Sequence, residues 1–222
     1  MFPLSDSIKP TRFPFLNYIL IAITVYVFFQ QLANPDALIA NYALIPAKVN
    51  LADYYSLIPF VTAIFLHGGF LHILSNMWFL KVFGDNVEGH LNPLAFIFLY
   101  FLAGIAGNVA QYLMMPNTAI PMLGASGAVA GILGCYFVIF PHAKIKTLLF
   151  IFFFVTITEI SAGFMLGYWF LLQIISAFGS IPGLGSQGGV AFFAHAIGFL
   201  VGIIFGKIYK NRGAIEGEIV YE

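Results

Sequence analysis

Long apolar runs separated by short polar stretches make up most of the chain. These runs approach the ~20 residues that a helix needs to cross a bilayer. They predict helices at about 14–33, 67–83, 92–115, 123–140, 161–178 and 190–209. The stretch from residue 34 to residue 66 carries Pro46 and Pro59, so we expect it to lie on the membrane interface rather than to span. The pattern predicts an all-α, six-helix bundle, with residues 1–222 forming one membrane domain.

Two interruptions decide where these helices end. The segment from Gly84 to His90 is polar and predicts a turn, whose acidic and amide side chains would fix the turn or cap the following helix (Asp85, Asn86 and Glu88). The apolar region 147–178 is too long for one span and too short for two. We therefore expect 147–158 to be extended or interfacial, ahead of the helix at 161–178.

Composition and charge support this membrane topology. Hydrophobic residues form 61% of the chain, only 8% is charged, and the net charge is zero, which gives no sign of a nucleic-acid partner. With six helices both termini lie on one side, and short cytoplasmic loops are expected to hold Lys and Arg. If the termini are cytoplasmic, the outer segments contain only Lys48, and the other cations lie inside (Lys9, Arg12, Lys81, Lys144, Lys146, Lys207, Lys210 and Arg212).

Four polar residues from three predicted helices share one depth in the membrane. Ser126 and His195 each lie near the outer end of a helix, roughly 4–8 Å below the surface at the helical rise per residue. His72 and Asn76 lie in the outer half of the helix at 67–83, and their spacing places them on one face. A histidine inside a membrane is costly and is usually functional.

Glycines would bring two of these helices close together. They recur at spacings of three and four in the helix at 123–140 and at spacings of four in the helix at 190–209, where His195 precedes Gly198 by three residues. Small residues at this period let helix backbones approach closely. Such proximity would allow a short serine side chain to reach an imidazole, although packing alone also explains the glycines.

Several separate motifs resemble the rhomboid intramembrane serine proteases. They occur in the family's order from residue 65 onward and are the runs Phe65–Met77, Phe83–Glu88, Gly124–Gly127, Trp169–Gln173 and Ala194–Phe199. The resemblance implies a Ser126–His195 catalytic dyad. It also implies an oxyanion hole formed by the backbone N–H of Ser126 with the side chains of His72 and Asn76. It implies cleavage of single-span membrane proteins in the bilayer, with no cofactor and no metal.

The chain departs from the family pattern beside the dyad. Many members carry an aromatic residue four positions after the serine, where this chain has Ala130. Phe192 or Phe193 would then hold the imidazole, or the dyad would be looser. No acidic residue lies near His195 in the outer half of its helix, so the sequence leaves open what orients the ring.

Other functions fit the sequence less well. A transporter would also use intramembrane His, Asn and Glu, but the chain lacks an inverted repeat and paired interrupted helices. The His-Glu-x-x-His motif of an intramembrane metalloprotease is absent. The alternative is a catalytically weak or inactive rhomboid-like protein that binds transmembrane helices. We expect a multi-pass protein of a prokaryotic inner membrane, with both termini cytoplasmic and the active site open to the extracytoplasmic side.

Overall fold

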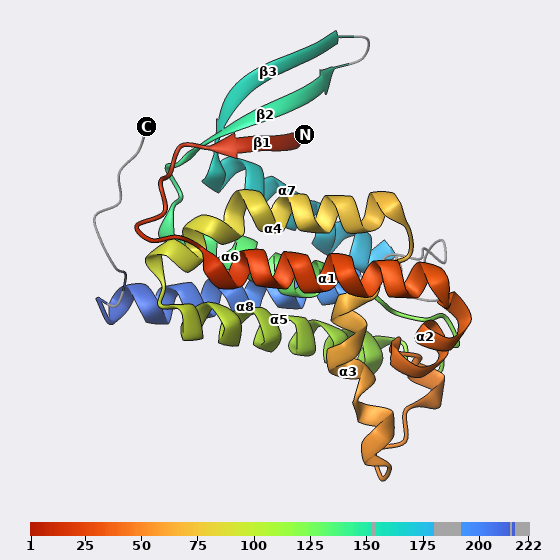
Figure 1. Cartoon of the computed structure of the whole chain (residues 1–222). Coiled ribbons are helices and arrows are strands. Elements are labelled where there is room, and N and C mark those ends of the chain that lie inside the picture. The colour runs from red at the N-terminus through yellow and green to blue at the C-terminus, as the bar shows by residue number, and fades with distance from the viewer. Residues whose placement is uncertain (152–153, 180–191, 214, 216–222) are drawn as a thin grey trace.

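The computed structural model describes residues 1–151, 154–179, 192–213 and 215 (Figure 1). Its helices are α1 (Phe15–Ala33), α2 (Pro35–Tyr42), α3 (Pro59–Thr62), α4 (Phe70–His90), α5 (Pro93–Met114), α6 (Ser126–Ile139), α7 (Ala162–Gly179) and α8 (Phe192–Asn211). Short 3-10 turns lie at Pro46–Lys48, Tyr54–Leu57 and Ala63–Phe65, and the strands are β1 (Phe2–Asp6), β2 (Lys144–Ile151) and β3 (Phe154–Ser161). Residues 180–189, between the last two predicted helices, and the first residues of the last predicted helix lie outside the described residues.

The six predicted helices correspond to α1, α4, α5, α6, α7 and α8. Among the described residues, α1, α5, α7 and α8 are long and apolar enough to cross a membrane. A fifth span results if α4 is joined to the segment Tyr54–Phe65, which meets it at an angle of 77°. α6 has 14 residues, fewer than the ~20 that a complete span needs. A mostly helical membrane bundle is therefore confirmed, whereas the number of six spans stays a prediction.

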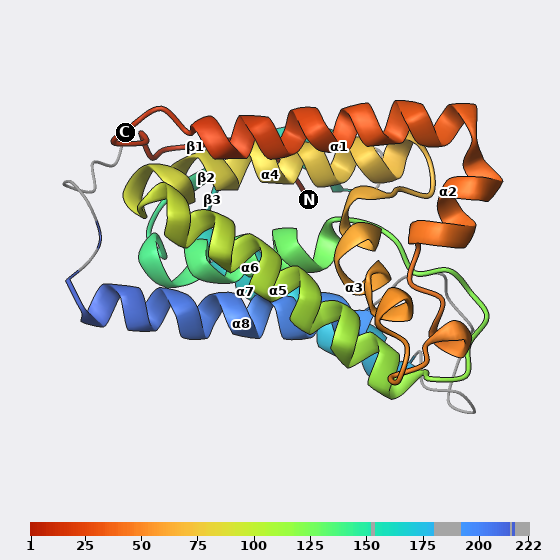
Figure 2. The same cartoon turned by 60° about the horizontal axis from the view of Figure 1, so that its bottom comes forward.

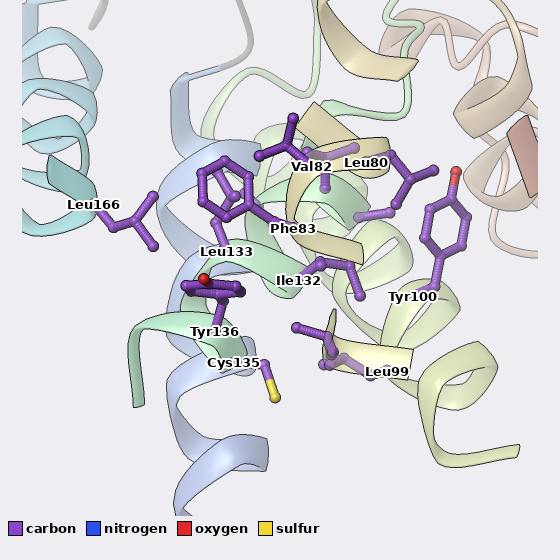
Figure 3. Packing of buried hydrophobic residues seen from close by; sticks show 14 of the residues in the cluster. Leu80, Val82, Phe83, Leu99, Tyr100, Ile132, Leu133, Cys135, Tyr136 and Leu166 are labelled. Carbon is purple, nitrogen blue, oxygen red and sulfur yellow. The ribbon is translucent and has the colours of Figure 1, made fainter. Parts of the chain in front are cut away.

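α6 forms the centre of the bundle, between α4 and α8 (Figure 2). Every residue from Gly127 to Tyr136 is buried. Leu80 and Phe83 of α4 and Leu166 of α7 belong to the same buried cluster as Leu133 and Tyr136 of α6 (Figure 3). Because α6 is enclosed by protein on all sides, it holds the first residue of the site in a rigid frame.

Glycines set the spacing between α6 and α8, as the sequence predicted. A β-carbon on Gly198 would overlap the carbonyl oxygen of Gly127, and one on Gly202 would overlap that of Gly131. No larger residue fits at these crossings without moving a backbone. The two helices therefore lie as close as their backbones allow.

The predicted turn between Gly84 and His90 is wrong, because α4 continues through it to His90. The prediction that Asp85, Asn86 or Glu88 caps the following helix is also wrong. Glu88 instead accepts hydrogen bonds from the backbone N–H groups of Leu16 (2.9 Å) and Asn17 (2.6 Å), at the start of α1. The cap of α5 is Asn92, whose side chain accepts from the N–H of Ala95. A partner distant in sequence thus satisfies the free N–H groups of α1.

A three-stranded antiparallel sheet lies beside the helices, with the strand order β1-β2-β3 (Figure 1). For the described residues of the predicted extended stretch at 147–158, the prediction is confirmed, since they belong to the antiparallel strands β2 and β3. The pairing of β1 with β2 was not predicted, because the partner strands are more than 130 residues apart in the chain. Phe2 of β1 stacks on Trp78 of α4 at 5.7 Å between ring centroids, so the sheet is anchored on α4.

Candidate active site

Ser126 is the first residue of α6. The chain reaches it through Gly124, whose φ of 128° lies in a region that only glycine adopts easily. The N–H of Gly124 donates to the carbonyl of Ala63 at 2.9 Å. Just before it, Met122 and Leu44 form an isolated two-residue β-bridge. These contacts fix the direction in which the chain enters α6, and with it the position of the serine hydroxyl.

His195 lies in the first turn of α8, and its imidazole meets the serine. The Oγ of Ser126 lies 2.7 Å from Nε2 of His195, within hydrogen-bond distance. The close crossing of α6 and α8 makes this reach possible, since the backbone of Ala194 also lies against Gly107 and Gly127. The two residues that the sequence placed at one membrane depth are therefore in direct contact.

Residues of α7 hold the other side of the imidazole. Nδ1 of His195 lies 2.7 Å from Oε1 of Gln173. The Trp169 ring is stacked on the imidazole at 6.0 Å between centroids and 28° between planes. Phe192 makes an edge contact at 6.3 Å, so that part of the prediction is confirmed, while no contact of Phe193 with the ring is seen. The sequence pointed to Trp169 and Gln173 as a family motif but not to their role; their spacing of one helical turn was the available signal.

His72 and Asn76, in the first two turns of α4, line the same cavity as Ser126 and His195. Nδ1 of His72 accepts a hydrogen bond from the N–H of Gly68 at 3.2 Å. An imidazole whose Nδ1 accepts carries its proton on Nε2 when it is neutral. That Nε2 lies against Gly124, where a β-carbon would come within 2.8 Å of it, so the N–H group faces the start of α6. Asn76 donates to the carbonyl of His72 at 3.1 Å and keeps a second amide N–H for other partners.

His67, just before α4, is fully buried. Its Nε2 accepts from the N–H of Ala125 at 3.4 Å. This contact supports the turn that leads into α6, and His67 is not among the residues that line the cavity around the dyad.

The cavity around the dyad has a volume of about 630 Å³. Apolar side chains from α4, α6 and α7 form much of its wall, with Phe79, Leu133 and Trp169 among them. Within the described part of the chain, no group of three or more His, Cys, Asp or Glu residues is arranged to hold a metal ion. The arrangement offers a hydroxyl, a base and hydrogen-bond donors inside an apolar chamber, which suits attack on a carbonyl group.

Comparison with known proteins finds relatives that share one family name. The chain is 38% identical over 143 residues to Rhomboid protein 1, mitochondrial, of Saccharomyces cerevisiae, covering 62% of this chain and 39% of the relative. It is 31% identical over 126 residues to Rhomboid protease GluP of Bacillus subtilis, covering 54% and 24%. It is 30% identical over 151 residues to RHOMBOID-like protein 1 of Arabidopsis thaliana, covering 68% and 34%. The chain thus matches less than half the length of these relatives.

The family comparison covers the site as well as most of the bundle. The Rhomboid domain matches residues 54–212, a range that contains Ser126, His195, His72 and Asn76. This match extends over well more than half of the chain, and the chain therefore belongs to the rhomboid family.

Proposed function

We propose that this protein is an intramembrane serine endopeptidase that cleaves transmembrane segments of single-span membrane proteins. The observation that carries the proposal is the 2.7 Å distance between the Ser126 hydroxyl and Nε2 of His195, inside a cavity with apolar walls. Family membership supports the same class of activity, since one of the relatives is named a rhomboid protease.

The chemistry follows from the two residues in contact. His195 takes the Ser126 proton on Nε2 while Oγ attacks the scissile carbonyl carbon, which forms a tetrahedral oxyanion. The imidazolium then gives its proton to the leaving amine, and the C–N bond breaks to leave an acyl-enzyme. A water molecule, deprotonated by the same imidazole, attacks the ester carbonyl. The imidazolium then returns its proton to Oγ of Ser126 as the ester C–O bond breaks and the second product leaves. Proton and charge are thus returned to their starting places.

The oxyanion would be stabilised by donors on two helices. The Ser126 N–H at the start of α6 has no carbonyl four residues earlier within its own helix, so it is free to donate. Nε2–H of His72 and the second amide N–H of Asn76 come from α4. Each such donor is worth about 3–4 kcal/mol of transition-state stabilisation in other hydrolases.

Substrates of this site must expose a peptide carbonyl. An intact transmembrane helix hides its carbonyls in backbone hydrogen bonds, so a helix-destabilising stretch near the outer end of the substrate is required. We propose that α7 moves away from α4 to admit it. A cross-link joining α4 to α7 tests this: turnover should fall, and unchanged turnover would refute the gate.

The proposed orientation of the protein in the membrane rests on its Lys and Arg residues, which short cytoplasmic segments are expected to hold. The start of α1 and the end of α8 lie at the same end of the bundle (Figure 2). Ser126 contacts His195 in the first turn of α8, towards the other end. We propose that this end is cytoplasmic, that the site opens to the extracytoplasmic side, and that the membrane is a prokaryotic inner membrane.

The decisive experiment is cleavage of a generic single-span substrate in liposomes. Ser126→Ala and His195→Ala should abolish cleavage, whereas Ser161→Ala and His142→Ala, at positions away from the cavity, should not. His72→Ala and Asn76→Ala should each slow cleavage by about 10²–10³-fold, the usual effect of removing one oxyanion donor. Equal cleavage by the wild type and Ser126→Ala would instead favour a rhomboid-like protein that binds transmembrane helices without cutting them.

A further inference from the structure

We propose that Gln173 of α7 is the positioning residue for His195, taking the place in this site that a carboxylate holds in a catalytic triad. This inference rests on the proposed function. It answers the question that the sequence left open, because the helix that carries His195 provides no acid and Ala130 provides no ring to hold the imidazole.

The geometry assigns a distinct partner to each nitrogen of the imidazole. Oε1 of Gln173 lies 2.7 Å from Nδ1, and Oγ of Ser126 lies 2.7 Å from Nε2. A side-chain amide oxygen can only accept, so Nδ1 must donate its proton to Gln173. Nε2 is then unprotonated and accepts from the serine hydroxyl. Gln173 therefore selects the tautomer in which His195 acts as a base.

A neutral acceptor suits this location. A carboxylate on α7 would carry a charge into an apolar, membrane-embedded wall, where charged groups are costly. The amide fixes the tautomer and the orientation of the ring without that cost. Trp169, one turn before Gln173 on α7, stacks on the face of the same ring and restricts its remaining rotation.

The support of the base therefore comes from a helix that carries neither member of the dyad. If α7 moves to admit substrate, Gln173 and Trp169 move with it. His195 is held in the productive tautomer only when α7 is packed on α8, so catalysis is coupled to closure of that helix over the site.

The test compares variants of Gln173 in the liposome assay. Gln173→Met keeps the length of the side chain and removes the acceptor, and it should lower kcat by about 10–100-fold with little change in KM, as expected for loss of a group that orients a catalytic ligand. Gln173→Glu restores an acceptor oxygen at the same reach and should recover kcat to within a few-fold. Gln30→Met, the same substitution at an exposed position on α1, is the control.

The outcomes separate this inference from the proposed function. If Ser126→Ala is inactive but Gln173→Met keeps its kcat, the positioning role is overturned and the dyad stands. If Gln173→Met and Gln173→Glu lose activity equally, the amide acts only in packing and the inference again fails. Should the Met variant not fold, Gln173→Asn, one methylene too short to reach Nδ1, replaces it in the comparison with Gln173→Glu.

Discussion

The side-chain amide of Gln31 forms two hydrogen bonds with the backbone of His67. Its Nε2 donates to the carbonyl oxygen at 2.7 Å, and its Oε1 accepts from the N–H at 3.0 Å. α1 thereby satisfies both polar groups of a buried, non-helical residue just before α4. His67 in turn contacts the turn that leads to Ser126, so a residue of α1 supports the site without lining it.

We expect Gln31→Leu to destabilise the protein by about 2–4 kcal/mol, because it leaves a buried N–H and a buried carbonyl without partners. Cleavage should also slow, because the segment carrying His67 is released. Gln30→Leu, exposed on the same helix, should have little effect. Unfolding in detergent micelles measures the difference in stability between the two variants. Equal stability would contradict a stabilising role for the two Gln31–His67 hydrogen bonds.

Gly202→Ala should be destabilising by about 1–3 kcal/mol, the usual effect of overpacking. The added methyl group would overlap the carbonyl of Gly131 and push α8 away from α6, so cleavage should fall as Ser126 and His195 separate. Gly167→Ala on α7 is the matched control, since its β-carbon would meet only the Phe137 ring at an ordinary 3.6 Å. Chemical unfolding measures both variants. If their free energies of unfolding are equal, close packing of the helices at Gly202 is not required.

Glu88→Ala should lower the free energy of unfolding by about 1–3 kcal/mol, because two backbone N–H groups of α1 lose their acceptor. Glu88→Gln should lose less, since it keeps one acceptor oxygen. Glu159→Ala, at an exposed position on β3, should remain within about 0.5 kcal/mol of the wild type. Chemical unfolding of the three variants tests the order; a loss for Glu159→Ala as large as for Glu88→Ala would argue against the cap.

Asp6 should make stability depend on pH. Burial raises the pKa of Asp6 from 3.8 to about 6, although Tyr136 and Asn86 donate hydrogen bonds that oppose the shift. Between these values the folded state holds a proton that the unfolded state has released. The contribution of protonated Asp6 to the free energy of unfolding is therefore fully present below about pH 4. It falls as pH rises towards 6, by at most about 1.4 kcal/mol per pH unit.

Thermal unfolding across this range measures the slope, with Asp6→Asn as the control. The variant has no carboxyl group at this position and should show a flatter profile. Asp85 of α4 is affected by the charge of Asp6 but is not among the groups that shift the pKa of Asp6, so Asp85→Asn should leave the pH dependence due to Asp6 in place. An unchanged slope in Asp6→Asn would assign the pH dependence to other groups.

Helix positions followed from the sequence because their cause is local. A long apolar run must form a helix in a bilayer, where every backbone N–H and carbonyl needs a partner within its own segment. The predicted end of the second helix was less accurate, because the polar residues after it resembled a turn whereas α4 continues to His90. Glu88 is tolerated inside that helix because the free N–H groups of α1 bind it, and that contact joins residues far apart in the chain.

The chain's own sequence determined the apolar spans, the glycine stripes and the shared depth of Ser126, His195, His72 and Asn76, since each of these depends on residue type and helical spacing alone. Tertiary structure decided how the imidazole is held, because Gln173 and His195 lie on separate helices whose relative rotation no local pattern specifies. It also decided the pairing of β1 with β2 and the clamp between Gln31 and His67. Contacts of this kind arise from packing of whole elements, and only the folded arrangement brings their atoms together.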